Sequence, residues 1–99
     1  VTRLFDSSGR LIANKQGGQL HSPEGDNIGH FVEHAGIFID MQGRYLGEIV
    51  NGNRLFCKTN SSYYNTQFPV QAVSGNIGNH GVTSTGTIAL PAGFEDISF

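Results

Sequence analysis

The chain has few of the residue types, and none of the long apolar runs, that identify several classes of protein. It has no tryptophan, one cysteine (Cys57) and only 14% charged residues. A lone cysteine excludes an intrachain disulfide and favours a cytoplasmic location, where thiols stay reduced. The 6 basic residues are scattered, whereas a surface that binds nucleic acid clusters them. No apolar run approaches the roughly 20 residues of a membrane-spanning helix, so neither nucleic acid nor a membrane is expected as a partner.

Helical patterns are missing as well. No window keeps apolar residues at i, i+3, i+4 and i+7 without an intervening glycine, asparagine or proline. Glycine is abundant instead, because its 14 residues are about twice the usual share of roughly 7%. The composition therefore predicts many tight turns and an all-β fold.

One stretch, 40–56, has the pattern of a complete β-hairpin. Asp40 followed three positions later by Gly43 favours a tight turn, since the aspartate can cap its own backbone and glycine tolerates positive φ. Residues that favour extended geometry follow, and Asn51-Gly52 is the dipeptide best suited to a type I′ turn. The rest of the chain contains looser copies of this hairpin.

Related units occur at about 4–20, 20–38, 38–56 and 70–90. The first three share the pattern G-x-x-[I/L]-[G/A], and the fourth has Ser74 in place of the first glycine. A small residue at the last position lets backbones approach closely, and we expect it near a pseudo-fourfold axis. The apolar residue before it points to the opposite face and should form the apolar layer. The small residues are Ala13, Gly29, Gly47 and Gly78, and the apolar residues are Ile12, Ile28, Leu46 and Ile77.

The repeat predicts one domain, 1–99, of four pseudo-repeated antiparallel β-hairpins around that axis, closed or nearly closed. A hairpin of this size cannot bury its apolar face alone, so the copies must pack around a shared centre. Residues 85–90 are expected to form a last strand that closes against 2–5. An insertion, 58–72, separates the third and fourth units, and 91–99 forms a tail.

These units, the hairpin sequence RYLGEIVNGNRLF and the ending LPAGFEDI together resemble the bacterial four-fold beta-flower domain, a small all-β family of uncharacterised function. The resemblance runs from Leu4 to Ile97. It implies four hairpins about a central axis, and it supplies no catalytic or ligand-binding residues. The fourth unit departs from the family pattern through Ser74 and the insertion before it.

The string HFVEH at 30–34 matches the H-x-x-E-H pattern of some zinc enzymes. On a helix, His30 and His34 would share a face and bind zinc while Glu33 activated a water. The repeat places these residues on a strand, where four residues span roughly 13 Å, too far for both imidazoles to reach one metal ion. Two exposed strand histidines and no cofactor are therefore expected, with a metal-dependent hydrolase as the rival hypothesis. A metal site shared between units would draw on His21, His30 or His34 with Asp26 or Glu24.

The insertion KTNSSYYNTQFPVQA, 58–72, combines aromatic rings with amides and hydroxyls. Such side chains suit recognition of a sugar, peptide or protein surface, and binding residues concentrate on loops that a rigid scaffold presents. The candidate binding residues are Asn60, Tyr63, Tyr64 and Asn65. The alternative is that Tyr64 and Phe68 fold back to cover one end of the barrel, because small domains need apolar cover.

The sequence contains no coherent catalytic set. Cys57 follows an apolar strand, where a small buried hydrophobic residue is expected rather than a nucleophile. The sequence therefore favours a binding or interaction module that uses the 58–72 loop, with a protein or a small polar ligand as its partner. A structural homo-oligomerisation domain is the other alternative, indicated by the low net charge and the apolar residues at 94–99.

Overall fold

The computed structural model describes residues 1–70, 75–81 and 83–97, which contain eight β-strands. No helix occurs in these ranges, and hence none that is long and apolar enough to cross a membrane. The all-β prediction is confirmed. The strands are β1 (Thr2–Phe5), β2 (Leu11–Gln16), β3 (Gln19–His21), β4 (Asn27–Val32), β5 (Ile37–Asp40), β6 (Tyr45–Val50), β7 (Arg54–Lys58) and β8 (Phe94–Asp96).

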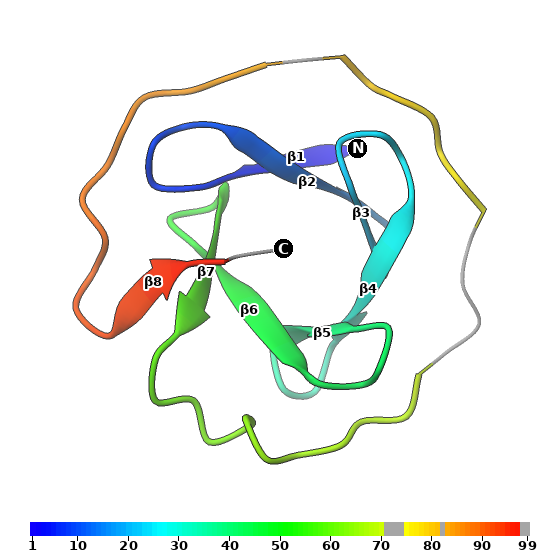
Figure 1. Ribbon diagram of the computed structural model, residues 1–99, viewed down its shortest axis with the longest axis vertical. Coiled ribbons are helices and arrows are strands. Elements are labelled where there is room, and N and C mark those ends of the chain that lie inside the picture. The colour runs from blue at the N-terminus through cyan, green and yellow to red at the C-terminus, as the bar shows by residue number, and fades with distance from the viewer. Residues whose placement is uncertain (71–74, 82, 98–99) are drawn as a thin grey trace.

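Seven strands close into a barrel, and the eighth lies outside it (Figure 1). Strands β1 to β7 pair antiparallel with their neighbours in chain order, and β1 also pairs in parallel with β7 through Phe5 and Arg54. β8 pairs antiparallel with β7. Closure was predicted, but the predicted closing strand at 85–90 is wrong, because β7 takes that place.

Three β-bulges position the apolar layer. The register shifts by one residue in the β1–β2, β3–β4 and β5–β6 pairs, and the extra residues are Ile12, Ile28 and Leu46. All three belong to or pack against the core inside the barrel, and so does Ile97. Ile97 therefore occupies the core position that was predicted for Ile77. The buried core residues are Leu4, Ile12, Ala13, Leu20, Phe38 and Leu55.

The fourth predicted hairpin, 70–90, does not form in the part of it that the structure describes. Residues 75–81 and 83–93 contain no strand, apart from one isolated bridge between Arg10 and Ser84. Gly78 and Gly81 have φ of 79° and 92°, in the left-handed region that an extended strand does not use. Ser74 and the rest of 71–74 lie outside the described residues. The pattern Asn-Ile-Gly was too short to distinguish a strand from a turn.

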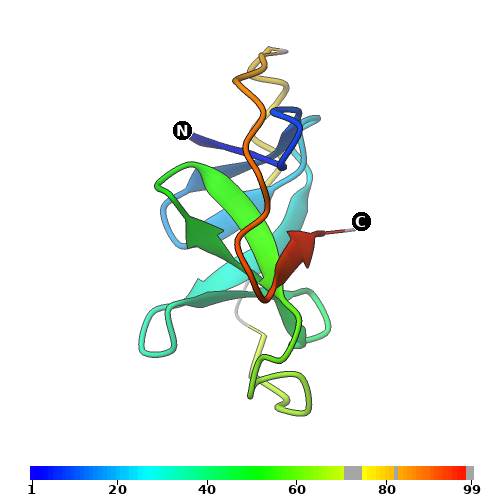
Figure 2. The same ribbon diagram turned by 90° about the vertical axis from the view of Figure 1, so that its left-hand side faces the viewer.

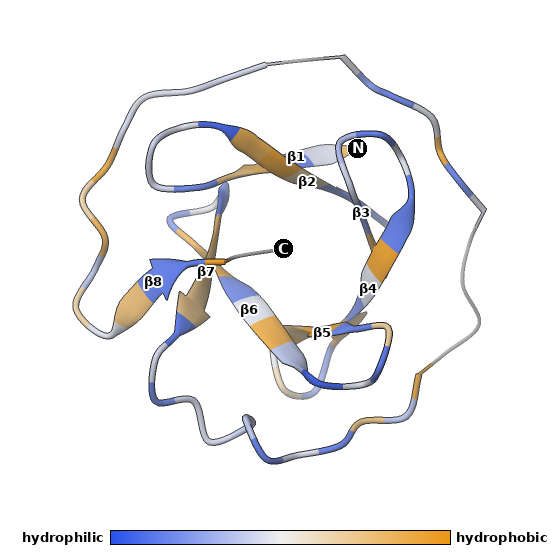
Figure 3. Ribbon diagram, in the orientation of Figure 1, coloured by the Kyte–Doolittle hydropathy of each residue, from blue (hydrophilic) through white to orange (hydrophobic). Residues whose placement is uncertain are grey.

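A long segment, which we call the belt, passes around the barrel instead (Figures 1 and 2). Its described residues are 59–70, 75–81 and 83–93, and much of it is hydrophilic, whereas hydrophobic residues concentrate in the strands (Figure 3). The belt begins and ends at one place, since the Thr59 amide donates to the Gly93 carbonyl oxygen at 2.8 Å. The β7–β8 pair closes this loop.

Three turns with one hydrogen-bond pattern hold the belt. In each of 6–10, 22–26 and 40–44, a side-chain oxygen of the first residue accepts a hydrogen bond from the amide of the fifth. The glycine of each turn then presents its carbonyl oxygen to a belt amide. These bonds run from the Phe68 amide to Gly43 (2.9 Å), from the Ile77 amide to Gly25 (3.0 Å) and from the Thr85 amide to Gly9 (2.9 Å).

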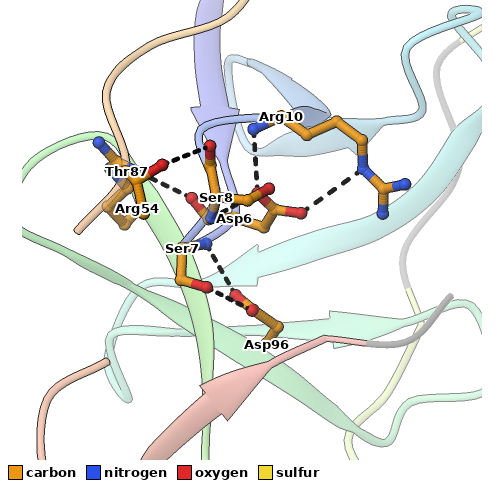
Figure 4. Close-up of polar contacts among 7 residues, drawn as sticks. All are labelled: Asp6, Ser7, Ser8, Arg10, Arg54, Thr87 and Asp96. Carbon is orange, nitrogen blue, oxygen red and sulfur yellow. Dashed lines mark hydrogen bonds and ion pairs between the residues drawn. The ribbon is translucent and has the colours of Figure 1, made fainter. Parts of the chain in front are cut away.

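Polar contacts stabilise the place where β1 pairs with β7, which we call the seam (Figure 4). The buried Arg54 guanidinium donates to the carbonyl oxygen of Asp6 at 2.8 Å and to that of Gly86 in the belt. Asp96 of β8 accepts hydrogen bonds from both the amide and the hydroxyl of Ser7. The seam thus joins the barrel, the first turn, the belt and β8.

The small residues predicted near the axis occupy two kinds of position. Ala13, Gly29 and Gly47 lie in β2, β4 and β6. A Cβ atom on Gly29 would lie 2.4 Å from the Ile39 carbonyl oxygen, so the backbones of β4 and β5 approach closely there. Gly78 lies in the belt and is not equivalent to the other three.

Candidate functional site

A pocket of about 350 Å³ opens beside β4, between the barrel and the belt. β4 contributes His30, and the turn that follows it contributes Glu33 and His34. The belt contributes Phe68 and Pro69. The pocket is therefore built from segments that are far apart in the sequence.

Strand alternation explains why His30 faces this pocket. The next residue, Phe31, points into the barrel, where its ring centroid lies 5.1 Å from that of Phe38. Successive strand residues point to opposite faces, so His30 points outward. Its cross-strand partner on β5, Ile39, points the same way and also lines the pocket.

The imidazole of His30 is buried and has no hydrogen-bond partner. His30 is 3% exposed, and neither Nδ1 nor Nε2 bonds to any of the described residues. Leaving a buried polar group unsatisfied costs about 1–3 kcal/mol. Buried polar groups in native proteins nearly always have a hydrogen-bond partner. The unpartnered imidazole of His30 therefore requires an explanation, and binding of a ligand would be one.

Phe68 forms the roof of the pocket. It is 8% exposed and packs in a second apolar cluster on the outer face of β5 and β6. Its ring centroid lies 5.8 Å from that of Tyr63 and 6.5 Å from that of His34. Phe68 thus folds back onto the barrel, and an aromatic surface borders the pocket.

The four predicted binding residues are divided by the fold. Tyr63 is half-buried beside Phe68, whereas Asn60 and Asn65 are exposed. Tyr64 is 43% exposed, and with Asn65 and Arg44 it borders a shallow hollow of about 320 Å³. Their role in binding stays a prediction.

Tyr64 is also tied to the barrel. Its ring meets that of Tyr45 edge-on at 5.3 Å, and its hydroxyl lies 2.9 Å from the Cys57 sulfur. The hydrogen bond with Cys57, together with burial, raises the pKa of Tyr64 to about 12. Cys57 itself is half-buried and packs against the outer cluster.

The residues of the rival metal hypothesis line one pocket without forming a metal centre. His30 lies in β4 and is buried, so the expectation that it is exposed is wrong, while His34 and Glu33 are exposed in the turn. The part of the chain that the structure describes contains no group of three or more histidine, cysteine or acidic side chains that could hold a metal ion. His21 is buried in β3, with Nδ1 3.2 Å from the Gly25 carbonyl oxygen.

A second, larger pocket lies between two turns and the belt. Its volume is about 450 Å³, and its lining includes Arg10, Glu24 and Thr83. The Arg10 side chain is 77% exposed and pairs with Asp6 at 3.5 Å. None of the residues that line this pocket has a buried side-chain nitrogen or oxygen atom without a hydrogen-bond partner. The smaller pocket beside His30 therefore carries the stronger indication of a ligand.

Sequence reasoning found the polar residues of the His30 pocket and missed its apolar ones. Val32 and Ile39 were assigned to no site, and Gly18 and Pro69 come from a distant turn and from the belt. Strand alternation could have placed His30 and Ile39 on one face. The sequence indicated that Phe68 could fold back onto the barrel, but not that it would cover these two residues.

Comparison of the chain with protein-family models, with curated proteins and with solved structures gives no match. The resemblance to the four-fold beta-flower domain is therefore supported only as far as a small all-β domain with a closed barrel.

Proposed function

We propose that this domain is a binding module for a small molecule, and that its site is the pocket between His30 and Phe68. The observation that carries the proposal is the buried imidazole with two unpartnered nitrogens at the floor of a pocket. A ligand group that bonds to this ring would offset the cost of burying it.

The pocket also has the general character of a small-molecule site. Ligand pockets span about 300–1,000 Å³ and combine mostly apolar walls with a few polar groups. Here the volume is about 350 Å³, Val32, Ile39, Phe68 and Pro69 supply apolar wall, and His30 supplies the inner polar group. The size fits a ligand of one or two rings.

A titration with four single-ring probes tests the proposal. We expect that at least one of phenol, toluene, benzoate and benzylamine causes saturable chemical-shift changes at Val32, His34 and Phe68. If none of the four does so, the proposal is wrong.

A cavity-filling variant supplies the matched control. Gly18 lines the pocket, its φ is not positive, and a Cβ atom there meets nothing within 4 Å. Gly18→Val should weaken binding of whichever probe binds. Gly75 in the belt has the same freedom but does not line the pocket, so Gly75→Val should leave binding unchanged.

We further propose that β7 and β8 form the fourth antiparallel pair of a four-unit domain of the beta-flower type. Ile97 supports this assignment, because it joins Ile12, Ile28 and Leu46 at the core. In that arrangement the belt replaces the short turn of the other hairpins. A cytoplasmic location also stays a proposal, which the lone thiol of Cys57 supports.

A further inference from the structure

The walls of the His30 pocket favour a flat apolar ligand body. The Phe68 ring lies near those of both His34 and Tyr63, at centroid distances of 6.5 and 5.8 Å. Aromatic rings prefer offset or edge-to-face neighbours at centroid distances of about 4.5–7 Å. A ligand ring can therefore pack against Phe68 and His34, with Val32 and Ile39 on the wall beside it.

The charges around the pocket favour a neutral ligand. No lysine or arginine lines it, and the one lining carboxylate, Glu33, is exposed. The nearby Lys15 belongs to the inner face, where its ammonium lies 5.9 Å from the centroid of the Phe31 ring. A buried anion would thus lack a permanently charged side chain to pair with, and burying an unpaired charge is costly. A cationic ligand would meet Glu33 only at the solvent-exposed rim, where an ion pair contributes little.

The polar floor requires a hydrogen-bonding group on that neutral ring. A neutral imidazole carries one donor and one acceptor nitrogen, and a hydroxyl can bond to either. Resting on the proposed function, we infer that the ligands of this pocket are neutral aromatic compounds with a hydroxyl group, of the phenol type. The hydroxyl bonds to a ring nitrogen of His30, and the aromatic ring lies beneath Phe68.

Phenol and toluene form a matched pair for testing this class, since a methyl group in toluene replaces the hydroxyl group of phenol on the same ring. We expect phenol to bind about fivefold more tightly than toluene, the ratio that corresponds to one net hydrogen bond of about 1 kcal/mol. Phenol should also bind more tightly than benzoate and benzylamine. Affinities come from nuclear magnetic resonance titrations of the whole chain.

His30→Phe keeps a ring of similar shape and removes both nitrogens. In this variant the ratio of phenol to toluene affinity should fall to about 1, with toluene affinity retained. Asn14→Leu is the control, because Asn14 is also buried with unpartnered side-chain atoms but lies outside the pocket. It should leave the ratio unchanged.

Two outcomes overturn the inference without affecting the proposed function. The first is that toluene, benzoate or benzylamine binds to the unaltered protein as tightly as phenol does. The second is that His30→Phe, shown by its amide spectrum to be folded, keeps the full preference for phenol. The comparison of the probes uses the unaltered protein. The inference can therefore still be refuted if His30→Phe does not fold. If no probe binds at all, the proposed function itself fails.

Discussion

Two buried polar residues, His30 and Asn14, lack hydrogen-bond partners among the described residues, and they differ in their surroundings. His30 lines a pocket, whereas Asn14 is completely buried and lines none. Both lie on strands directly after a small residue, Gly29 or Ala13. The proposed binding would explain the histidine, and nothing in the structure explains the asparagine.

Replacing Asn14 with leucine should stabilise the protein. The change removes a buried amide whose Nδ2 and Oδ1 are both unpaired, and an unsatisfied buried polar group costs about 1–3 kcal/mol. The free energy of unfolding, measured with urea, should rise by about that amount. A decrease would show that Asn14 has a stabilising contact.

His30→Phe should stabilise the protein for the same reason, while removing the preference for phenol. A substitution that raises stability while it removes binding specificity is typical of a functional site. If His30→Phe instead lowered the free energy of unfolding, the unpartnered state of the imidazole would be in doubt.

The carboxyl group of Asp6 should make stability depend on acid pH. Burial raises the pKa of Asp6, but hydrogen bonds from Ser8 and Arg10 and the charge of Arg10 together lower it below 3.8. A carboxyl whose pKa is lower in the folded than in the unfolded state stabilises the fold above the unfolded value, and this contribution is lost as the pH falls through the folded value.

Asp6→Asn should therefore be less stable than the unaltered protein at neutral pH, and the difference should shrink as the pH falls below about 3.8. Urea unfolding across this range measures the effect. Glu24→Gln, an exposed site with the same change of charge, is the control. A difference between Asp6→Asn and the unaltered protein that stayed constant with pH would contradict the account.

At the scale of elements, the three glycine turns fix the path of the belt. A Cβ atom on Gly43 would lie 2.2 Å from the Phe68 carbonyl oxygen, and one on Gly9 would lie 2.0 Å from that of Thr85. Gly43 also has φ of 82°. The turn therefore needs glycine both for its own backbone and for its contact with the belt.

Gly43→Ala should detach the belt near Phe68. Gly36→Ala is the matched control, because Gly36 has φ of 68° but open space around its Cβ position. Both changes carry the strain of a left-handed alanine, roughly 1–2 kcal/mol, and only the first displaces the belt. Hydrogen exchange at the Phe68 amide, which bonds to Gly43, should accelerate in Gly43→Ala alone. Equal acceleration in both variants would mean that the contact does not hold the belt.

The strands and turns of the barrel could be predicted from local sequence, and the belt could not. The turn from Asp40 to Gly43 and the turn at Asn51-Gly52 contain residue types that are characteristic of tight turns. Asn51 has the positive φ of 54° that the Asn-Gly pattern predicts. The Asn-Ile-Gly string at 76–78 has the same letters as 27–29 in β4. Its neighbours supply no alternating apolar residues, and at Ile77 the belt bonds through its backbone amide to the Gly25 carbonyl oxygen.

At the scale of the molecule, the belt completes a pocket that contains a buried unpaired polar group, the His30 imidazole. Phe68 and Pro69 partly cover the outer face of β4 and β5, and a pocket forms between them and that face. The same segment ends at β8, whose Asp96 contacts the first turn. The contacts of Asp96 with the first turn and the cover that Phe68 gives the pocket thus come from one continuous segment, which sequence patterns assigned to separate units.

The most direct test of the binding site is a crystal structure of the protein with phenol. The account predicts a phenol ring beneath Phe68, with its hydroxyl oxygen within hydrogen-bond distance of Nδ1 or Nε2 of His30. Phenol bound only elsewhere, or bound beneath Phe68 with its hydroxyl turned to solvent, would contradict it.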